Sequence, residues 1–179
     1  MQNSFYTPEE LLTIGFKAVG HNVLISRFSQ IYGVKNIEIG NNVRIDDFCI
    51  LSGDIKLGNY IHISAYSALY GQYGIQMDDY SGLSPRCTIF SASDDFSGEY
   101  QIGSMVDPGF RNIIHGKVLI NKYCQLGSQC LVLPGVTINE GVAVGAYSLV
   151  NRDLESWRIY KGIPAKFHKE RSRKLLNFD

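Results

Sequence analysis

The chain lacks the features that mark three common classes of protein. Lys and Arg total 17 and Asp and Glu total 17, so no net charge draws the 179-residue chain to nucleic acid or to an anionic membrane. No stretch approaches the roughly 18 apolar residues of a membrane-spanning helix. The first residues lack the basic and apolar segments of a signal peptide. We therefore expect a cytoplasmic protein without nucleic-acid or membrane partners.

Cysteine is scarce, and its spacing does not match a zinc site. The four cysteines are Cys49, Cys87, Cys124 and Cys130, and no two of them form a CxxC pair. Paired cysteines at that spacing are usual ligands of structural zinc, so no metal is expected. All four instead stand at the small position of a repeat, which predicts that they are buried core residues.

The feature that the sequence does have is an apolar repeat with a period of six. Isoleucine, leucine or valine returns at every sixth position from Ile39 to Leu69, and again from Ile114 to Val150. A small residue stands four places after most of these returns. Amphipathic helices repeat near 3.6 residues and simple strands near 2, so neither explains this period. A sustained period of six is typical of a parallel β-helix, in which short strands stack from coil to coil.

The breaks in the repeat lie at related places. Grouping the repeats in threes gives a triangular prism of about six coils, with every irregular step on the same corner. The longest irregular step must leave the prism as a loop over residues 94–112, and loops of this length in a compact array are usually functional. The irregular steps run from Ile31 to Ile39, from Leu69 to Met77 and from Ile89 to Ile114.

The segments on either side of the prism complete one domain over residues 1–179. Residues 1–18 are predicted to form a helical cap, because Thr7, Pro8 and Glu10 match the start of a helix with a capping box. The prism is expected over 19–150, followed by a loop and a short helix over 151–179. Six basic residues and one acid lie between Lys161 and Lys174, which makes this end locally basic.

Several segments resemble one enzyme family. IEIGNNVRI and IKLGNYIHI carry its aliphatic-Gly-x-x-small pattern, and CQLGSQCLVLPGVTINEGVAVGAYSLVNRDLESW, followed by KGIPAKF, resembles its C-terminal signature. The family is that of the hexapeptide-repeat, left-handed β-helix acyltransferases. The similarity covers roughly residues 19 to 170 and is greatest to the sugar acetyltransferases of the galactoside and maltose type and their relatives in surface-polysaccharide (O-antigen) pathways.

This resemblance implies a homotrimer of left-handed prisms that uses acetyl-CoA. The cofactor would lie between neighbouring prisms, with the acceptor sugar under the projecting loop. By position, Ser128 and Ala146 match residues that hold the pantetheine arm, and Asn151 and Arg152 match a pair that contacts CoA. Lys166 matches a basic residue near the CoA phosphates, to which the basic end is suited. The alternative interpretation is a basic terminal helix that is merely solvated.

The sequence departs from the family at the expected catalytic histidine. In IFSASDDFSG, Asp94 stands where that histidine should be. A carboxylate is a weak base for a sugar hydroxyl, so two other bases are considered. His115 is expected at the re-entry of the loop, within hydrogen-bonding reach of Asp94 if the strands stack about 4.8 Å apart. His62 lies at another corner and could face the loop of a neighbouring subunit.

A second explanation is that the acceptor is an amine. A neutral sugar amine attacks a thioester more readily than a hydroxyl does, and Asp94 could orient it. The candidate substrate-binding residues are Asp95 and Arg111 in the loop and the tyrosines Tyr66 and Tyr70, whose flat rings with polar tips suit a sugar or a nucleotide base. The expected reaction is therefore acetyl transfer to a sugar or a nucleotide-linked amino sugar.

Two alternatives without this activity are retained. The first is a non-catalytic β-helix scaffold or sensor, which the replacement of the expected histidine favours. The second is a γ-class carbonic anhydrase, whose prism binds zinc through histidines. Its HxxxxH spacing does not occur in this chain.

Overall fold

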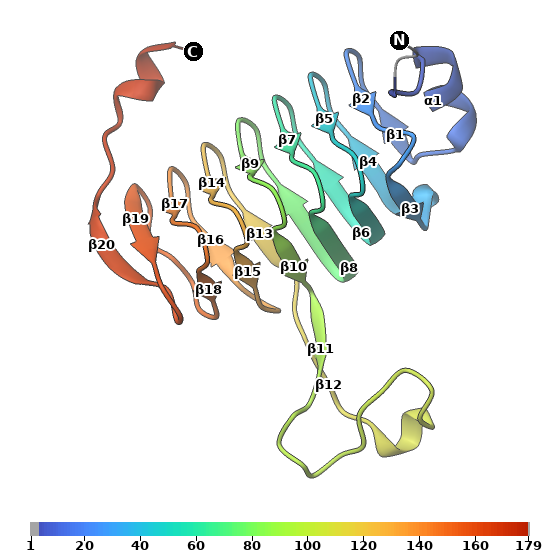
Figure 1. Ribbon diagram of the computed structural model, residues 1–179, viewed down its shortest axis with the longest axis vertical. Helices are drawn as coiled ribbons and strands as arrows, with labels where there is room; N and C mark the ends of the chain where they lie inside the picture. The colour runs from blue at the N-terminus through green and yellow to red at the C-terminus, as the bar shows by residue number, and fades with distance from the viewer. Residues whose placement is uncertain (1–3, 179) are drawn as a thin grey trace.

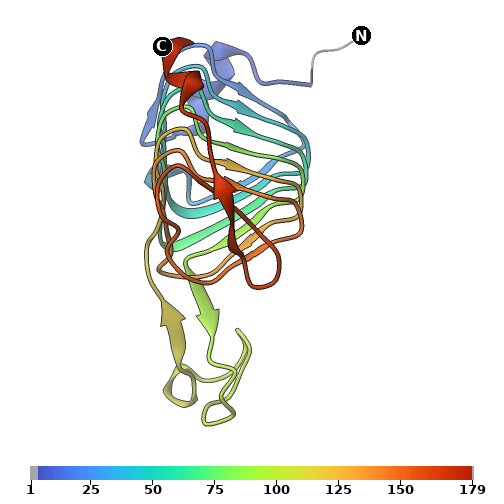
Figure 2. The ribbon, with the colours of Figure 1, turned by 90° about the vertical axis from the view of Figure 1, so that its left-hand side faces the viewer.

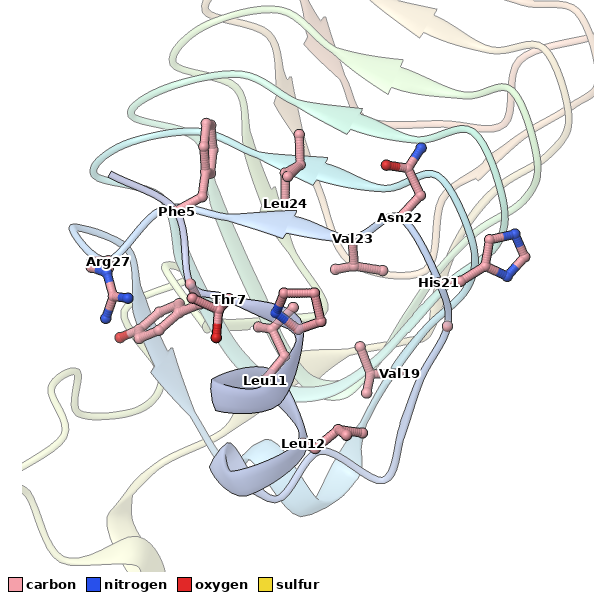
Figure 3. A pocket seen from close by; sticks show the side chains of 13 residues that line it. Phe5, Thr7, Leu11, Leu12, Val19, His21, Asn22, Val23, Leu24 and Arg27 are labelled. Atoms are coloured by element: carbon pink, nitrogen blue, oxygen red, sulfur yellow. The ribbon is translucent and has the colours of Figure 1, made fainter. Parts of the chain in front are cut away.

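A computed structural model describes residues 4–178. The chain winds into a prism of stacked parallel strands, from which one long segment projects (Figure 1). At the N-terminal end, helix α1 (Pro8–Ile14) covers the first coil, and its capping box of Thr7 and Glu10 is confirmed. Leu11 of this helix is buried in the core. A mainly apolar cavity of about 740 Å³ lies between α1 and the first coil (Figure 3).

The second face of the prism shows the stacking most simply, because no segment interrupts it. Each strand pairs in parallel with the next, and one aliphatic residue of each faces the core at the same register. Val144 then pairs with Tyr160, which adds a level. The strands are β2 (Leu24–Ile25), β5 (Arg44–Ile45), β7 (His62–Ile63), β9 (Gly82–Leu83), β14 (Gln125–Leu126), β17 (Ala143–Val144) and β19 (Arg158–Lys161).

The seven stacked strands of this face show that the prism has about seven coils, and not the six that the sequence predicted. The aliphatic period ends at Val150, but Tyr160 occupies the next inward position and is buried. A tyrosine can fill that position because its hydroxyl accepts a hydrogen bond from the Glu155 amide at 3.1 Å. The prism therefore extends past residue 150, where the sequence pattern predicted a loop.

The first and third faces meet at the corner that carries the irregular steps. Two long strands, β6 and β8, run across this corner and contribute to both faces. First-face strands are β1 (Ala18–Val19), β4 (Ile37–Ile39), the ends of β6 (Ile50–Leu57) and β8 (Ala68–Met77), β13 (Val118–Ile120) and β16 (Thr137–Ile138). Third-face strands are β3 (Gln30–Tyr32), the starts of β6 and β8, β10 (Thr88–Phe90), β15 (Leu131–Val132) and β18 (Leu149–Val150). A 3-10 turn, η1 (Val34–Asn36), joins β3 to β4.

The register confirms that the irregular steps share this corner, but it corrects where the repeat resumes. Ile120, and not Ile114, pairs with Met77 on the first face. Ile114 is 51% exposed and belongs to β12 (Ile113–His115), which pairs antiparallel with β11 (Ala92–Asp94). The period misplaced Ile114 because an apolar residue of this strand stands six residues before Ile120.

The projecting segment, residues 91–116, is called the excursion below. It leaves the prism after β10, extends as the β11–β12 ribbon and ends in a loop that contains the 3-10 turn η2 (Pro108–Phe110) (Figures 1 and 2). The excursion therefore begins before residue 94 and ends after residue 112, because its first and last residues pair with each other as strands.

The predicted C-terminal helix is wrong. Residues of KFHKE form strand β20 (Lys166–Glu170), which pairs antiparallel with β19, and only the short 3-10 turn η3 (Lys174–Phe178) follows. Arg171 explains the extended path, because its guanidinium donates to the carbonyls of Tyr123 at 2.7 Å and Gly141 at 3.0 Å. These contacts hold the segment against two coils of the prism.

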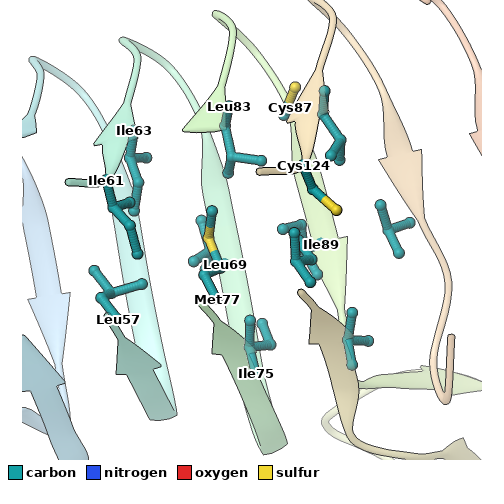
Figure 4. Packing of buried hydrophobic residues seen from close by; sticks show 14 of the residues in the cluster. Leu57, Ile61, Ile63, Leu69, Ile75, Met77, Leu83, Cys87, Ile89 and Cys124 are labelled. Carbon is teal, nitrogen blue, oxygen red and sulfur yellow. The ribbon is translucent and has the colours of Figure 1, made fainter. Parts of the chain in front are cut away.

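The core is one continuous stack of aliphatic residues and thiols (Figure 4). All four cysteines are buried, as their place in the repeat predicted. Burial raises the pKa of Cys49 to about 11 and that of Cys124 to about 12, so both remain protonated thiols at neutral pH. None of the helices within residues 4–178 has the length and apolar character needed to cross a membrane.

Candidate active site

The root of the excursion is fixed by a buried serine. Ser91 directly follows β10, and its hydroxyl donates to the Tyr70 carbonyl and accepts from the Tyr73 amide, both at 2.9 Å. The Ser91 carbonyl accepts from the Gly116 amide at 3.0 Å, which closes the base of the ribbon. The excursion thus leaves the prism in a defined direction, and the residues at its root have fixed positions.

A pocket of about 500 Å³ lies at this root, between the excursion and the third face. Phe90 and Leu131 reach it because they stand at outward positions of β10 and β15, which are paired in register. Most of its wall is apolar, and the charged groups are Asp94 and Arg111. The lining residues are Gln72, Phe90, Ala92, Ser93, Asp94, Phe96, Arg111, Ile113, Leu131 and Leu133.

Asp94 and Arg111 form an ion pair inside this pocket. The Arg111 Nη2 donates to Asp94 Oδ1 at 3.0 Å, and both side chains are largely buried, with exposures of 20% and 23% for Arg111 and Asp94. The turn η2 positions Arg111, whose backbone amide donates to the Pro108 carbonyl at 3.2 Å. The Arg111 Nε atom is buried and has no hydrogen-bond partner among residues 4–178. An unpaired buried donor is costly and is a place where a ligand oxygen could bind.

The expected hydrogen bond between Asp94 and His115 is absent, and this prediction was wrong. The strands pair antiparallel, so Asp94 lies opposite Ile113 and His115 lies opposite Ala92. His115 instead stacks on Tyr73, with ring centroids 4.1 Å apart and planes inclined by 11°. It does not line the pocket, although it lies at the root of the excursion. Its catalytic role remains a prediction that this geometry does not favour.

His62 belongs to a different part of the prism. It lies on β7 of the second face, and its Nε2 is 2.7 Å from Asp46 Oδ2. Arg44 donates to the other oxygen of Asp46 at 2.7 Å. Burial alone would raise the pKa of Asp46, but the hydrogen bonds from Arg44 and His62 hold it below its ordinary value. Within one subunit the structure does not bring His62 to Asp94, so its proposed role requires a neighbouring subunit.

The candidate substrate-binding residues separate into two groups. Asp95 continues the excursion, where its Oδ2 accepts from Asn112 at 2.8 Å and a hydrogen bond from the Ser97 amide lowers its pKa. Tyr70 stacks on the pocket residue Phe90, with centroids 5.1 Å apart. Tyr66 lies on another corner, stacked on Phe48 and covered by the Arg86 guanidinium. Of these candidates only Arg111 lines the pocket. Tyr70 lies behind the lining residue Phe90 and Asp95 follows the lining residue Asp94, whereas Tyr66 is remote.

The candidate CoA-binding residues flank the third face beyond the pocket. Ser128 and Ala146 stack at the corner before this face, where the Ser128 carbonyl accepts from the Tyr147 amide at 2.9 Å. Asn151 and Arg152 follow β18 at the corner after it, one coil beyond the pocket residue Leu133. Lys166 begins β20 and is exposed. The roles of all five stay predictions.

Sequence reasoning missed most of the pocket wall. Phe90, Leu131 and Leu133 stand at outward positions of the third face, where a solvated prism would carry polar residues. That pattern was a usable signal, because large outward apolar residues on neighbouring coils indicate a covered surface. Phe96 and Ile113 gave no such signal. Among residues 4–178, no three His, Cys, Asp or Glu side chains are grouped so that they could hold a metal ion.

Comparisons with known proteins add to this geometry. No family model matches the chain. The chain is 44% identical over 173 residues to the dTDP-4-amino-4,6-dideoxy-D-glucose acyltransferase of Escherichia coli, covering 95% of this chain and 90% of that protein. It is 27% identical to WbbJ of Escherichia coli K12, a putative lipopolysaccharide biosynthesis O-acetyl transferase, over 76% of this chain and 69% of that one.

One solved structure is similar over nearly the whole chain. The crystal structure of AntD, an N-acyltransferase from Bacillus cereus, in complex with dTDP and 3-hydroxybutyryl-CoA superposes with a TM-score of 0.97 at 48% sequence identity. The match covers 99% of this chain and 95% of AntD. The similarity therefore includes the excursion as well as the prism.

Proposed function

Because the chain belongs to the acyltransferase family that includes the Escherichia coli dTDP-4-amino-4,6-dideoxy-D-glucose acyltransferase, we propose that it transfers an acyl group from coenzyme A to a dTDP-linked 4-amino-4,6-dideoxyhexose. The observation that carries this proposal is the Asp94–Arg111 pair in the pocket, at the place where a hydroxyl acceptor would need a histidine. An amine acceptor needs orientation more than it needs a strong base, and a carboxylate oxygen supplies that orientation.

The chemistry assigned to the site is direct acyl transfer. The lone pair of the sugar nitrogen attacks the thioester carbon, the C–N bond forms and the C–S bond breaks. One amine proton stays on the product amide, and the other leaves with CoA as the thiol. Asp94 accepts an N–H hydrogen bond and aims the lone pair. His115 stacks on Tyr73 outside the pocket and is not needed as a base.

The cofactor residues follow the family resemblance. We assign Ser128 and Ala146 to the pantetheine arm, Asn151 and Arg152 to the CoA moiety nearer its phosphates, and Lys166 to the phosphates. Asn151 lies one coil from Leu133 of the pocket, which supports a path of CoA beside the third face. Acetyl is the expected acyl group. The complex of AntD with 3-hydroxybutyryl-CoA makes a longer acyl group the alternative to test.

The assembly and the setting are also proposed. A homotrimer would bring His62 of a neighbouring second face, and the corner that carries Tyr66 and Arg86, toward the excursion. Light scattering after gel filtration would measure the mass, and a monomer that is fully active would exclude a shared site. Because nucleotide sugars and CoA thioesters are both cytoplasmic metabolites, the proposed reaction belongs there, within surface-polysaccharide biosynthesis.

A direct test compares two acceptors that differ only in the group at carbon 4, which is an amine in one and a hydroxyl in the other. Purified protein is incubated with acetyl-CoA or 3-hydroxybutyryl-CoA and either dTDP-4-amino-4,6-dideoxyglucose or dTDP-6-deoxyglucose, which has a hydroxyl at carbon 4. The free thiol of released CoA is measured over time, and the mass of the sugar product is determined by mass spectrometry. We expect turnover with the amine and at least 100-fold less with the alcohol. Greater turnover with the alcohol would overturn N-acylation, and CoA binding without turnover on either would favour the non-catalytic scaffold.

A further inference from the structure

The Asp94–Arg111 pair leaves one acceptor and one donor unused. Arg111 occupies Asp94 Oδ1, and among residues 4–178 the second oxygen, Oδ2, accepts no hydrogen bond. On the other side of the pair, Arg111 Nε is buried without a partner. Asp94 Oδ2 therefore remains available as an acceptor for a ligand, and Arg111 Nε remains available as a donor. The negative charge of Asp94 and the positive charge of Arg111 cancel.

Among residues 4–178, no other charged side chain lines this pocket. The strands packed against β11 are β12 and β8, and the titratable groups that they bring to the root are His115, Tyr73 and Tyr70. Asp95 follows β11 but is held by Asn112 and the Ser97 amide. The remaining lining is apolar or uncharged. The charge state of a bound ligand is therefore governed mainly by Asp94 and Arg111.

A lone carboxylate would be a poor partner for an amine nucleophile. In a mostly apolar pocket it would favour the ammonium form, because opposite charges attract strongly where water is scarce. An ammonium ion has no lone pair and cannot attack a thioester. A carboxylate already paired with a guanidinium attracts a further cation much less, and the guanidinium, which does not lose its proton in proteins, repels it.

We propose, on the basis of the function proposed above, that Arg111 is a positioning residue that keeps the bound acceptor amine uncharged by neutralising Asp94. The uncharged amine donates one N–H to Asp94 Oδ2, and its lone pair is free for the thioester carbon. The Nε–H of Arg111 donates to an oxygen of the bound substrates, which satisfies the buried donor. In the transfer, the nitrogen gains the acyl carbon and loses one proton, and the CoA sulfur leaves with one proton, so no oxidant or other reactant is required.

The test is the dependence of the kinetic constants on pH. The acidic limb of kcat/KM reports groups of the free enzyme and free substrate, whereas that of kcat reports the bound complex. If the site disfavours the ammonium form, the acidic limb of kcat lies at lower pH than that of kcat/KM in the unaltered enzyme. The reverse order, or coincident limbs, would overturn the proposal without any substitution being made.

Substitutions then identify Arg111 as the cause. Arg111→Gln removes the charge, Arg111→Lys keeps it, and Lys117→Gln is the matched control. Lys117 carries the same charge just beyond the excursion, where its Nζ lies 3.0 Å from Gln76 Oε1, and it does not line the pocket. All proteins are compared for folding by circular dichroism before their kinetics are measured with dTDP-4-amino-4,6-dideoxyglucose.

For Arg111→Gln we expect the acidic limb of kcat to move up by about one pH unit, so that kcat falls about tenfold on that limb and recovers at high pH. Arg111→Lys should lie between this variant and the unaltered enzyme, and Lys117→Gln should not shift. An equal fall in kcat at every pH would show a merely structural role and reject the inference. If the unaltered enzyme acylates no amino sugar, the proposed function fails instead, so the two failures are distinct.

Discussion

The prism buries a continuous stack of aliphatic side chains, whereas the excursion is held together by polar contacts. Ile63, Leu83 and Leu126 in the prism are buried and repeat at the same register on successive coils. In the excursion, the ordering contacts are the Asp94–Arg111 ion pair and the Asp95–Asn112 hydrogen bond. From this difference we expect stability to depend mainly on the prism and substrate specificity on the excursion. Substitutions should therefore separate the two properties.

The largest effect on stability is expected from a cavity in the prism. Ile63→Ala removes buried methyl groups from a rigid stack, and the free energy of unfolding should fall by about 2–5 kcal/mol. Met105→Ala, at a residue of the excursion that is 96% exposed, should change it by less than about 0.5 kcal/mol. Urea unfolding followed by circular dichroism measures both. Similar losses from the two variants would contradict the division between prism and excursion.

The largest effect on activity is expected from Asp94 in the excursion. Asp94→Asn keeps the shape of the side chain but loses the negative charge that pairs with Arg111, so kcat should fall about 100-fold. The affinity for CoA should change little. The control is Glu99→Gln, an exposed acid of the same loop that does not line the pocket. A loss of activity below about threefold for Asp94→Asn would show that another group orients the acceptor.

An intermediate effect is expected at the joint between the two regions. Ser91→Ala leaves the Tyr73 amide without its acceptor, and unfolding free energy should fall by about 1–3 kcal/mol. Ser81→Ala is the matched control, because this buried serine of the prism makes one hydrogen bond, to the Asp78 carbonyl at 2.6 Å. We also expect faster proteolytic cleavage within residues 91–116 of Ser91→Ala. Equal stability of the two variants would show that the ribbon is fixed by other contacts.

The contrast between the prism and the excursion also explains which parts of the fold could be predicted from the sequence. The period of six predicted the stacked strands, the buried cysteines and the shared corner, because each inward position obeys one simple rule of burial. It failed at Ile114 and at Tyr160. Ile114 is an exposed residue of β12 that happens to fit the period. Tyr160 occupies an inward position, but it is a tyrosine where the repeat has an aliphatic residue.

The site was only partly predictable for a related reason. Alignment within the repeat located Asp94 correctly at the root of the excursion. Its partner could not be derived, because the antiparallel register of β11 and β12 is set by Ser91 and by the turn before Arg111, and not by the repeat. The stacking distance of the prism was applied to a ribbon that does not stack, and this produced the wrong pairing with His115.

The smallest effect is expected where the prism and the basic end would meet CoA. Arg152 and Lys166 are both exposed, so each interaction with a phosphate is screened and contributes about 0.2–1 kcal/mol. Alanine at either residue should raise KM for acyl-CoA by about 2- to 5-fold and leave kcat unchanged, with the difference vanishing at high salt. Lys35→Ala, an exposed cation far away in the sequence near the first coils, is the control.

Dephospho-CoA, which lacks the 3′-phosphate, makes this last comparison sharper. If Lys166 binds that phosphate, Lys166→Ala and the unaltered enzyme should have the same KM for dephospho-CoA, because the phosphate that Lys166 would bind is absent. A defect that persists with dephospho-CoA would assign Lys166 to the diphosphate, which dephospho-CoA keeps, or to the support of the hairpin of β19 and β20, and not to the 3′-phosphate. A defect in kcat would place this end of the molecule close to the reacting atoms, where the pocket geometry does not put it.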